Sequence, residues 1–190
     1  MFKKHLAALL AAALVMPMVA HASGDHHAGD AAVAQAFIKE IQTDQSAYAA
    51  AKGATFFQEL SKGQKPRATV VTCSDSRVHT NMLDRTPEGD LFMVRNIGNQ
   101  LESTLGSVQY GVEHLNTPVL LILGHTGCGA VKAALSDTRT LEDPIRRELS
   151  GLHLKKVKGA VDDKRWADAV VENVHDQVRA GLKQFGARVN

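Results

Sequence analysis

The sequence predicts an α/β domain with a central, mostly parallel β-sheet of about four strands flanked by helices. Three short apolar runs have the length and composition of strands, at residues 68–73, 91–95 and 118–124. They alternate with segments of helical periodicity, which is typical of strand–helix units in a parallel sheet. The last run is apolar without interruption, as expected for a strand that is covered on both faces.

The segments between and after these runs have helical spacing. Apolar residues over 101–115 predict a crossover helix, and further helices are expected after Cys128, around residues 141–154 and over residues 162–185. In the last of these, one face is predicted to carry Trp166, Val170, Val174 and Val178. Before the first strand, an Ala-rich segment predicts two helices with a break near Thr43 and Asp44.

The first 22 residues have the form of a secretory signal peptide. Lys3 and Lys4 precede an apolar stretch over residues 6–19, and the small residue Ala22 follows at the expected cleavage point. The apolar stretch is too short to serve as a permanent membrane span. We therefore expect cleavage after Ala22 and a periplasmic or secreted product.

The remainder has the size and charge of one soluble domain. Removing 22 of the 190 residues leaves 168, which suits a single core. Residues 23–30 are small and polar and are expected to form a flexible N-terminus, so the predicted domain covers residues 31–190. The leader holds two of the 22 Lys and Arg residues, which leaves 20 against 20 Asp and Glu. This balance argues against nucleic acid as a partner, and no further apolar stretch suggests a membrane span.

Two clusters of reactive side chains follow predicted strands. The first strand ends in Cys73, followed closely by Asp75 and Arg77, and the 118–124 strand is followed by His125 and Cys128. The carboxyl ends of parallel strands border the crevice where ligands bind, so the two clusters are expected to converge. Two thiolates and one imidazole match a catalytic zinc site with a fourth position open for water.

A different reading of the two cysteines is a structural disulfide, since an exported protein meets an oxidising compartment. The protein would then be a disulfide-stapled, non-enzymatic α/β module. This alternative explains neither the acid–base pair beside Cys73 nor His125 three residues before Cys128. A thiol oxidoreductase is disfavoured because the sequence has no Cys-x-x-Cys motif.

These motifs resemble those of the β-class carbonic anhydrases. The resemblance rests on CSDSR at residues 73–77 and GHTGCG at residues 124–129, and extends to GQKP, DLFMVRNIGN and SVQYGVEHL in the flanking segments. It implies reversible hydration of carbon dioxide to bicarbonate and a proton by zinc-bound hydroxide. One Zn²⁺ per chain would be held by Cys73, His125 and Cys128, with Asp75 and Arg77 orienting the hydroxide. Some relatives hydrolyse carbonyl sulfide or carbon disulfide with the same kind of zinc site, so the resemblance does not decide between these substrates and carbon dioxide.

The resemblance also implies a substrate pocket and an assembly. Gln64, Phe92, Ile97 and Tyr110 fall where the plant-like, open-site subtype lines its carbon dioxide pocket. Because part of that pocket comes from a neighbouring subunit, Gln64 and Tyr110 are expected to act across the interface of a homodimer or a larger homo-oligomer.

Two departures from the pattern of this family carry expectations of their own. The sequence stops at Asn190, where relatives usually continue into another edge strand, which predicts weak dimerisation and exposed apolar surface. Relatives that close their site at low pH carry a Trp three residues before the first cysteine, whereas this chain has Val70. Asp75 is therefore expected to stay on Arg77.

Overall fold

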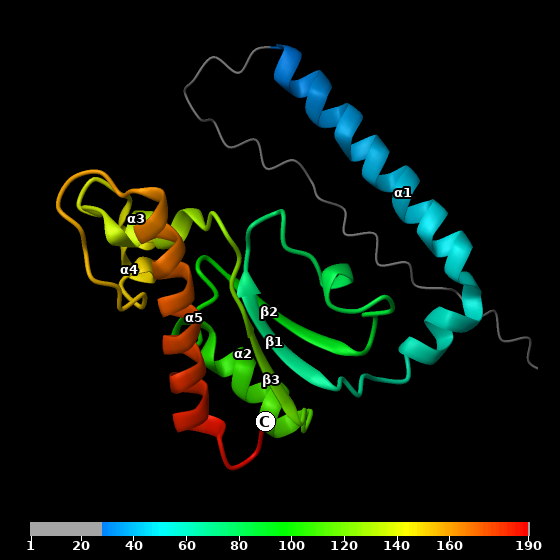
Figure 1. Cartoon of the computed structure of the whole chain (residues 1–190). Coiled ribbons are helices and arrows are strands. Elements are labelled where there is room, and N and C mark those ends of the chain that lie inside the picture. The colour runs from blue at the N-terminus through cyan, green and yellow to red at the C-terminus, as the bar shows by residue number, and fades with distance from the viewer. Residues whose placement is uncertain (1–27, 190) are drawn as a thin grey trace, which may run out of the picture. The chain divides into compact units, whose positions relative to one another are not determined.

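The computed structural model describes residues 28–189 (Figure 1). The predicted signal peptide and most of the N-terminal segment 23–30 lie outside the described residues. The chain divides into two compact units, residues 1–54 and residues 55–190. The described part of the first unit is helical, since helix α1 runs over Ala28–Leu60. This helix begins three residues before the predicted start of the domain at residue 31. None of the described helices is long and apolar enough to cross a membrane.

Helix α1 is interrupted at Gly53, where the backbone is non-helical (φ 76°, ψ 165°). The break expected near Thr43 and Asp44 is therefore wrong. The Thr43 hydroxyl donates to the carbonyl of Lys39 at 2.9 Å, so its polar group is satisfied within the helix. Gly53 adopts a positive φ without the steric cost that a Cβ atom would impose, which explains why the interruption occurs there.

The second unit contains a parallel sheet built from the three predicted strands. They are β1 (Ala68–Cys73), β2 (Leu91–Asn96) and β3 (Val119–Leu123), in the order β2-β1-β3. The register places Cys73 opposite Asn96 and Thr72 opposite Leu123, so all three strands end at the same edge. The parallel α/β architecture is confirmed, with three strands in the described residues where about four were expected.

The helices of this unit lie at the predicted places. After the short turns η1 (Thr80–Met82) and η2 (Glu102–Thr104) they are α2 (Leu105–Gln109), the π-turn η3 (Tyr110–His114), α3 (Gly129–Leu135), α4 (Asp143–Leu149) and α5 (Asp163–Phe185). The predicted crossover helix is thus a continuous helical segment over residues 102–114, which changes from a 3-10 turn to an α-helix and then to a π-helix. It packs closely on the sheet at Gly111, where a Cβ atom would collide with the Thr69 side chain.

Helix α5 packs on β3 and on α3 (Figure 1). The Asp162 carboxylate caps its first turn by accepting from the Arg165 backbone N–H at 2.7 Å. Val170 is buried as predicted, but Val178 on the same face remains 39% exposed. The core next to the strand ends contains both cysteines, which pack with α3 and α5. Strand β1 and helices α3 and α5 therefore form the surroundings of the two cysteines that the sequence analysis identified.

Candidate metal centre

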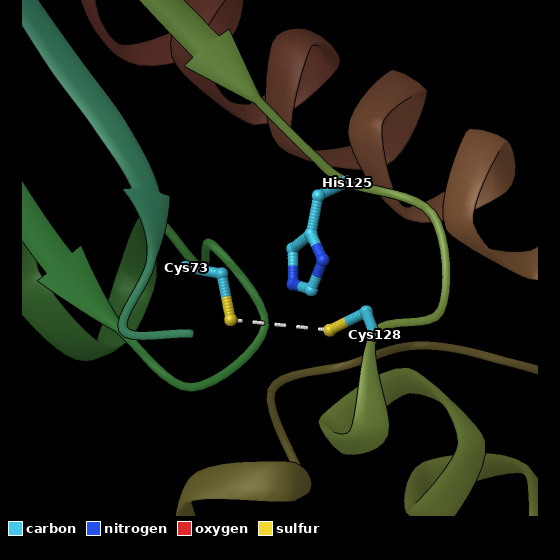
Figure 2. Close-up of side chains that lie close together, drawn as sticks. All are labelled: Cys73, His125 and Cys128. Atoms are coloured by element: carbon cyan, nitrogen blue, oxygen red, sulfur yellow. Dashed lines mark hydrogen bonds between the residues drawn. The ribbon is translucent and has the colours of Figure 1, made fainter. Parts of the chain in front are cut away.

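The parallel sheet brings both reactive clusters to one point. Cys73 is the last residue of β1, and β3 ends two residues before His125. Gly127 has a positive φ of 68°, which turns the chain so that Cys128 lies just before α3. Figure 2 shows the imidazole ring directed toward the two cysteine sulfurs. The convergence predicted for the strand ends is present.

The three side chains have the spacing of metal ligands. Their ligand atoms all lie within 4.8 Å of one another, and the two sulfur atoms are 3.9 Å apart. Two sulfurs bound to one tetrahedral zinc at about 2.3 Å each would be separated by about 3.8 Å. Cys73 and Cys128 are 5% and 1% exposed, so the site is shielded from bulk water. The donor set and its spacing fit zinc.

The cysteine sulfurs are not joined. A disulfide bond is about 2.05 Å long, whereas these atoms lie 3.9 Å apart and both cysteines are free. The two sulfurs are within hydrogen-bonding distance of each other, and either thiol can be the donor. This contact lowers the pKa of Cys73 and raises the pKa of Cys128. A metal ion must displace the thiol protons before both sulfurs can bind it as thiolates.

The surroundings of His125 select its metal-binding tautomer. Its Nδ1 lies 3.0 Å from the carbonyl oxygen of Thr126, which can only accept a hydrogen bond, so the proton belongs on Nδ1. The Nε2 lone pair is then free. This atom is buried and has no hydrogen-bond partner among the described residues. A buried acceptor without a partner is costly, and a metal ion between His125 and the sulfurs would satisfy it.

Asp75 and Arg77 form an acid–base pair beside the three ligands. The Arg77 Nε and Nη2 atoms donate to the two carboxylate oxygens at 2.8 and 2.7 Å, and its backbone N–H donates to Oδ1 at 3.0 Å. These bonds hold the pKa of Asp75 well below its usual range. Arg77 Nη2 also donates to the carbonyl of Gly127 at 3.1 Å, which ties the pair to the Cys128 turn. Asp75 Oδ2 lies 3.8 Å from His125 Nε2, so the carboxylate faces the metal position.

This site occurs within a recognised family. The sequence profile described as carbonic anhydrase matches residues 68–186, which include both clusters. The chain belongs to the carbonic anhydrase family. A carbonic anhydrase of Emericella nidulans is 33% identical over 156 residues, covering 76% of this chain and 68% of that protein. Carbonic anhydrase 2 of Mycobacterium tuberculosis is 46% identical over 78 residues, which is 40% of this chain and only 38% of that enzyme.

Solved structures place the fold in the β-class of carbonic anhydrases. A Coccomyxa β-carbonic anhydrase in complex with acetazolamide is similar with a TM-score of 0.62 and 26% identity, covering 77% of this chain and 75% of that one. A tetrameric β-carbonic anhydrase of Sordaria macrospora has a TM-score of 0.65, with coverage of 78% and 81%. At 24% identity, the latter shows a common fold only.

The four predicted pocket residues of this carbonic anhydrase chain are not together. Ile97 directly follows β2, and its neighbour Gly98 lies against Cys73. Phe92 is near the start of β2, and its ring packs on Tyr110 with the centroids 5.9 Å apart. Tyr110 and Gln64 line one open hollow of about 590 Å³. Phe92 lies four strand positions, or about 13 Å, before Asn96 at the site edge. Of the four residues, Ile97 is the one that is adjacent in sequence to a residue in contact with a predicted metal ligand.

Two supporting residues were not singled out from the sequence. Arg95 Nε donates to the carbonyl of Cys73 at 3.1 Å, and its Nη2 donates to the carbonyl of Asp75 at 2.8 Å. Trp166 Nε1 donates to the carbonyl of Cys128 at 2.8 Å. The signal for Arg95 was a charged residue ending an otherwise apolar strand. Trp166 gave no such signal, because its helical spacing is equally explained by core packing.

Proposed function

We propose that this protein catalyses the reversible hydration of carbon dioxide to bicarbonate and a proton, with one zinc ion per chain. The observation that carries the proposal is the convergence of two free thiols on a His125 Nε2 atom that is buried and unpartnered among the described residues. Membership of the carbonic anhydrase family supports the same reaction. The disulfide-stapled module is disfavoured, because the two sulfurs are 3.9 Å apart.

The protein groups around the metal position have separate tasks in this reaction. When bound, zinc lowers the pKa of water toward about 7, which makes a nucleophile available near neutral pH. Asp75 remains ionised beside Arg77 and can accept a hydrogen bond from the attacking water, which aims an oxygen lone pair at carbon dioxide. Arg77 fixes the carboxylate through two parallel hydrogen bonds. Ile97 offers apolar surface to a small, nearly apolar substrate.

The remaining pocket residues support a homodimer or larger homo-oligomer. In one chain Gln64 and Tyr110 line a hollow that the metal centre does not share. We propose that a second copy places its Gln64 and Tyr110 near the metal position of the first. Apolar side chains are available for association, since Val119 and Leu121 on the edge strand β3 are 40% and 36% exposed.

We further assign the site to the plant-like, open subtype. Val70, three residues before Cys73, is fully buried in β1. Asp75 already makes three hydrogen bonds to Arg77, so leaving Arg77 to bind the metal would sacrifice all of them. Asp75 is therefore expected to remain on Arg77 at mildly acidic pH.

The first residues support export, with cleavage after Ala22 and a periplasmic or secreted enzyme. The mass of the exported protein tests this. A mature chain beginning at Ser23 is expected, and a mature chain that retains Met1 would contradict export.

Stopped-flow carbon dioxide hydration by the zinc-loaded chain tests the activity. The matched control is Cys73→Ser, which removes one ligand from a buried strand end with little change in volume. We expect rapid hydration by the wild type, loss of activity in the variant and slow or absent hydrolysis of carbonyl sulfide and carbon disulfide. A zinc-loaded wild type that hydrolyses either sulfur compound but does not hydrate carbon dioxide would overturn the substrate assignment.

A further inference from the structure

Helix α5 carries two buried amide side chains that the proposed reaction does not use. Asn173 and Gln177 are one helical turn apart and only 1% and 5% exposed. Gln177 Nε2 donates to Asn173 Oδ1 at 3.2 Å, so the two side chains form one unit, here called the amide pair. Burying two amides is unfavourable unless their hydrogen bonds are satisfied, which raises the question of what they hold.

The amide pair holds the loop that follows β2. Asn173 Nδ2 donates to the carbonyl of Gly98 at 2.9 Å, and Gln177 Oε1 accepts from the backbone N–H of Leu101 at 2.8 Å. Between these anchors the loop takes two consecutive left-handed conformations, with φ of 84° at Gly98 and 48° at Asn99. Such a backbone persists only where its surroundings fix it, and the amide pair fixes it at both ends.

The anchored loop touches the metal centre at one atom. The backbone N–H of Gly98 donates to the Cys73 sulfur, with nitrogen and sulfur 3.5 Å apart. On the side where a Cβ atom would stand, Gly98 is closely packed, because such an atom would lie 3.0 Å from the Leu152 side chain. The carbonyl of the same residue is the one that Asn173 holds. The amide pair is therefore two hydrogen bonds away from a predicted metal ligand.

We propose that Asn173 and Gln177 are positioning residues of the metal centre. Through the loop they keep the Gly98 N–H on the Cys73 sulfur and thereby set how much negative charge that thiolate donates to the metal. A hydrogen bond to a thiolate withdraws charge from sulfur, and loss of a hydrogen-bond partner of a metal ligand typically costs about 10- to 100-fold in metal affinity or activity. This inference rests on the proposed zinc site and identifies a determinant of its electronic character.

Two near-isosteric variants separate this role from simple packing. Asn173→Leu removes the hydrogen bond to Gly98 directly, and Gln177→Met removes the anchor at Leu101 and the support of Asn173. The matched control is Phe185→Leu on the same helix, because Phe185 is 1% exposed and packs in a core cluster that includes the Leu101 side chain but neither cysteine. All three variants lose buried contacts, but only the first two remove a hydrogen bond that holds the loop.

The readouts are the thiolate-to-cobalt charge-transfer band of the cobalt-loaded chain and zinc affinity by competition with a chelator. We expect a shift of the band to longer wavelength in Asn173→Leu, because a sulfur without its N–H donor gives up electrons more readily. Zinc affinity should fall by about tenfold in the same variant. Gln177→Met should show both changes in the same direction but smaller, and Phe185→Leu should show neither despite lower stability.

The outcomes distinguish the inference from the proposed function. A wild-type band that is unchanged in both amide variants, with wild-type zinc affinity, would reduce the amide pair to a packing feature. If Asn173→Leu does not fold, the result for Gln177→Met decides in the same way. A wild-type chain that binds cobalt without any thiolate band would instead overturn the proposed metal site, and the inference with it.

Discussion

At the carboxyl ends of the strands, Cys73, His125 and Cys128 converge within 4.8 Å in a shielded site, whereas at the amino ends Gln64 and Tyr110 line an open hollow. The first group is built by one chain, since the sheet order and the turn at Gly127 are sufficient to assemble it. Among the described residues, the lining of this hollow includes none of the three residues of the metal centre. In the proposed homo-oligomer, the metal centre would therefore come from the fold of one chain and part of the substrate pocket from its neighbour.

The largest effect is expected from Asp75→Asn at the carboxyl ends. This variant should keep zinc but lose about two to three powers of ten in turnover, or ~3–4 kcal/mol, because the attacking water is no longer oriented. Zinc content measured on the sample used for carbon dioxide hydration separates lost chemistry from lost metal. Near-normal turnover, or an acidic-pH crystal structure in which Asp75 bonds to zinc, would overturn the role assigned to Asp75.

The next prediction tests whether the amino ends complete a neighbouring site. Gln64→Ala and Cys73→Ser should each be impaired alone, but co-expression should produce mixed dimers with one intact zinc centre facing one intact Gln64. Random pairing of equal amounts makes half of the dimers mixed, each with one working site, so activity should recover to about a quarter of wild type.

A second pairing tests the same arrangement by co-expression of Gln64→Ala with Asp75→Asn, which should keep zinc but lose turnover, in place of Cys73→Ser. It should recover activity to the same extent, because Asp75 also belongs to the zinc-bearing side. Activities in either mixture that equal only the average of the two separate variants would show that Gln64 does not act across an interface.

The smallest effect is expected from Thr69→Val near the amino ends. The Thr69 hydroxyl is buried and lies 2.8 Å from that of Thr117, which can still donate to the carbonyl of Gly111 after the substitution. The free energy of unfolding should fall by about 1 kcal/mol in denaturant titration. Zinc affinity should be unchanged, and a marked loss of zinc would show that the two ends of the sheet are coupled.

Local patterns were sufficient to predict the strands and the convergence of Cys73, His125 and Cys128. The runs ending at Cys73 and near His125 are long and apolar, and parallel pairing alone brings their carboxyl ends together. Arg95 was missed because a terminal charge on a strand is the same signal whether it faces solvent or holds the carbonyls of Cys73 and Asp75. Its role depends on a contact between strands that sequence periodicity does not encode.

The helical segments show the same limit. The position of α5 followed from its apolar spacing, which is local. The π-helical segment at residues 110–114 contains Gly111, which closely approaches Thr69 in a tertiary contact that sequence spacing does not encode. The break in α1 occurs at Gly53, whereas Thr43 finds a hydrogen-bond partner within the helix, and helix propensity alone does not distinguish these outcomes.

Zinc and thiol content measured on one unreduced sample of the purified chain tests the proposed metal centre. We expect close to one zinc per chain, and two titratable thiols once the protein is unfolded and the zinc is chelated, because metal-bound Cys73 and Cys128 would be protected from oxidation. Zinc-free protein without a titratable thiol would show that the two cysteines form a disulfide, which would contradict the metal centre and the reaction proposed for it.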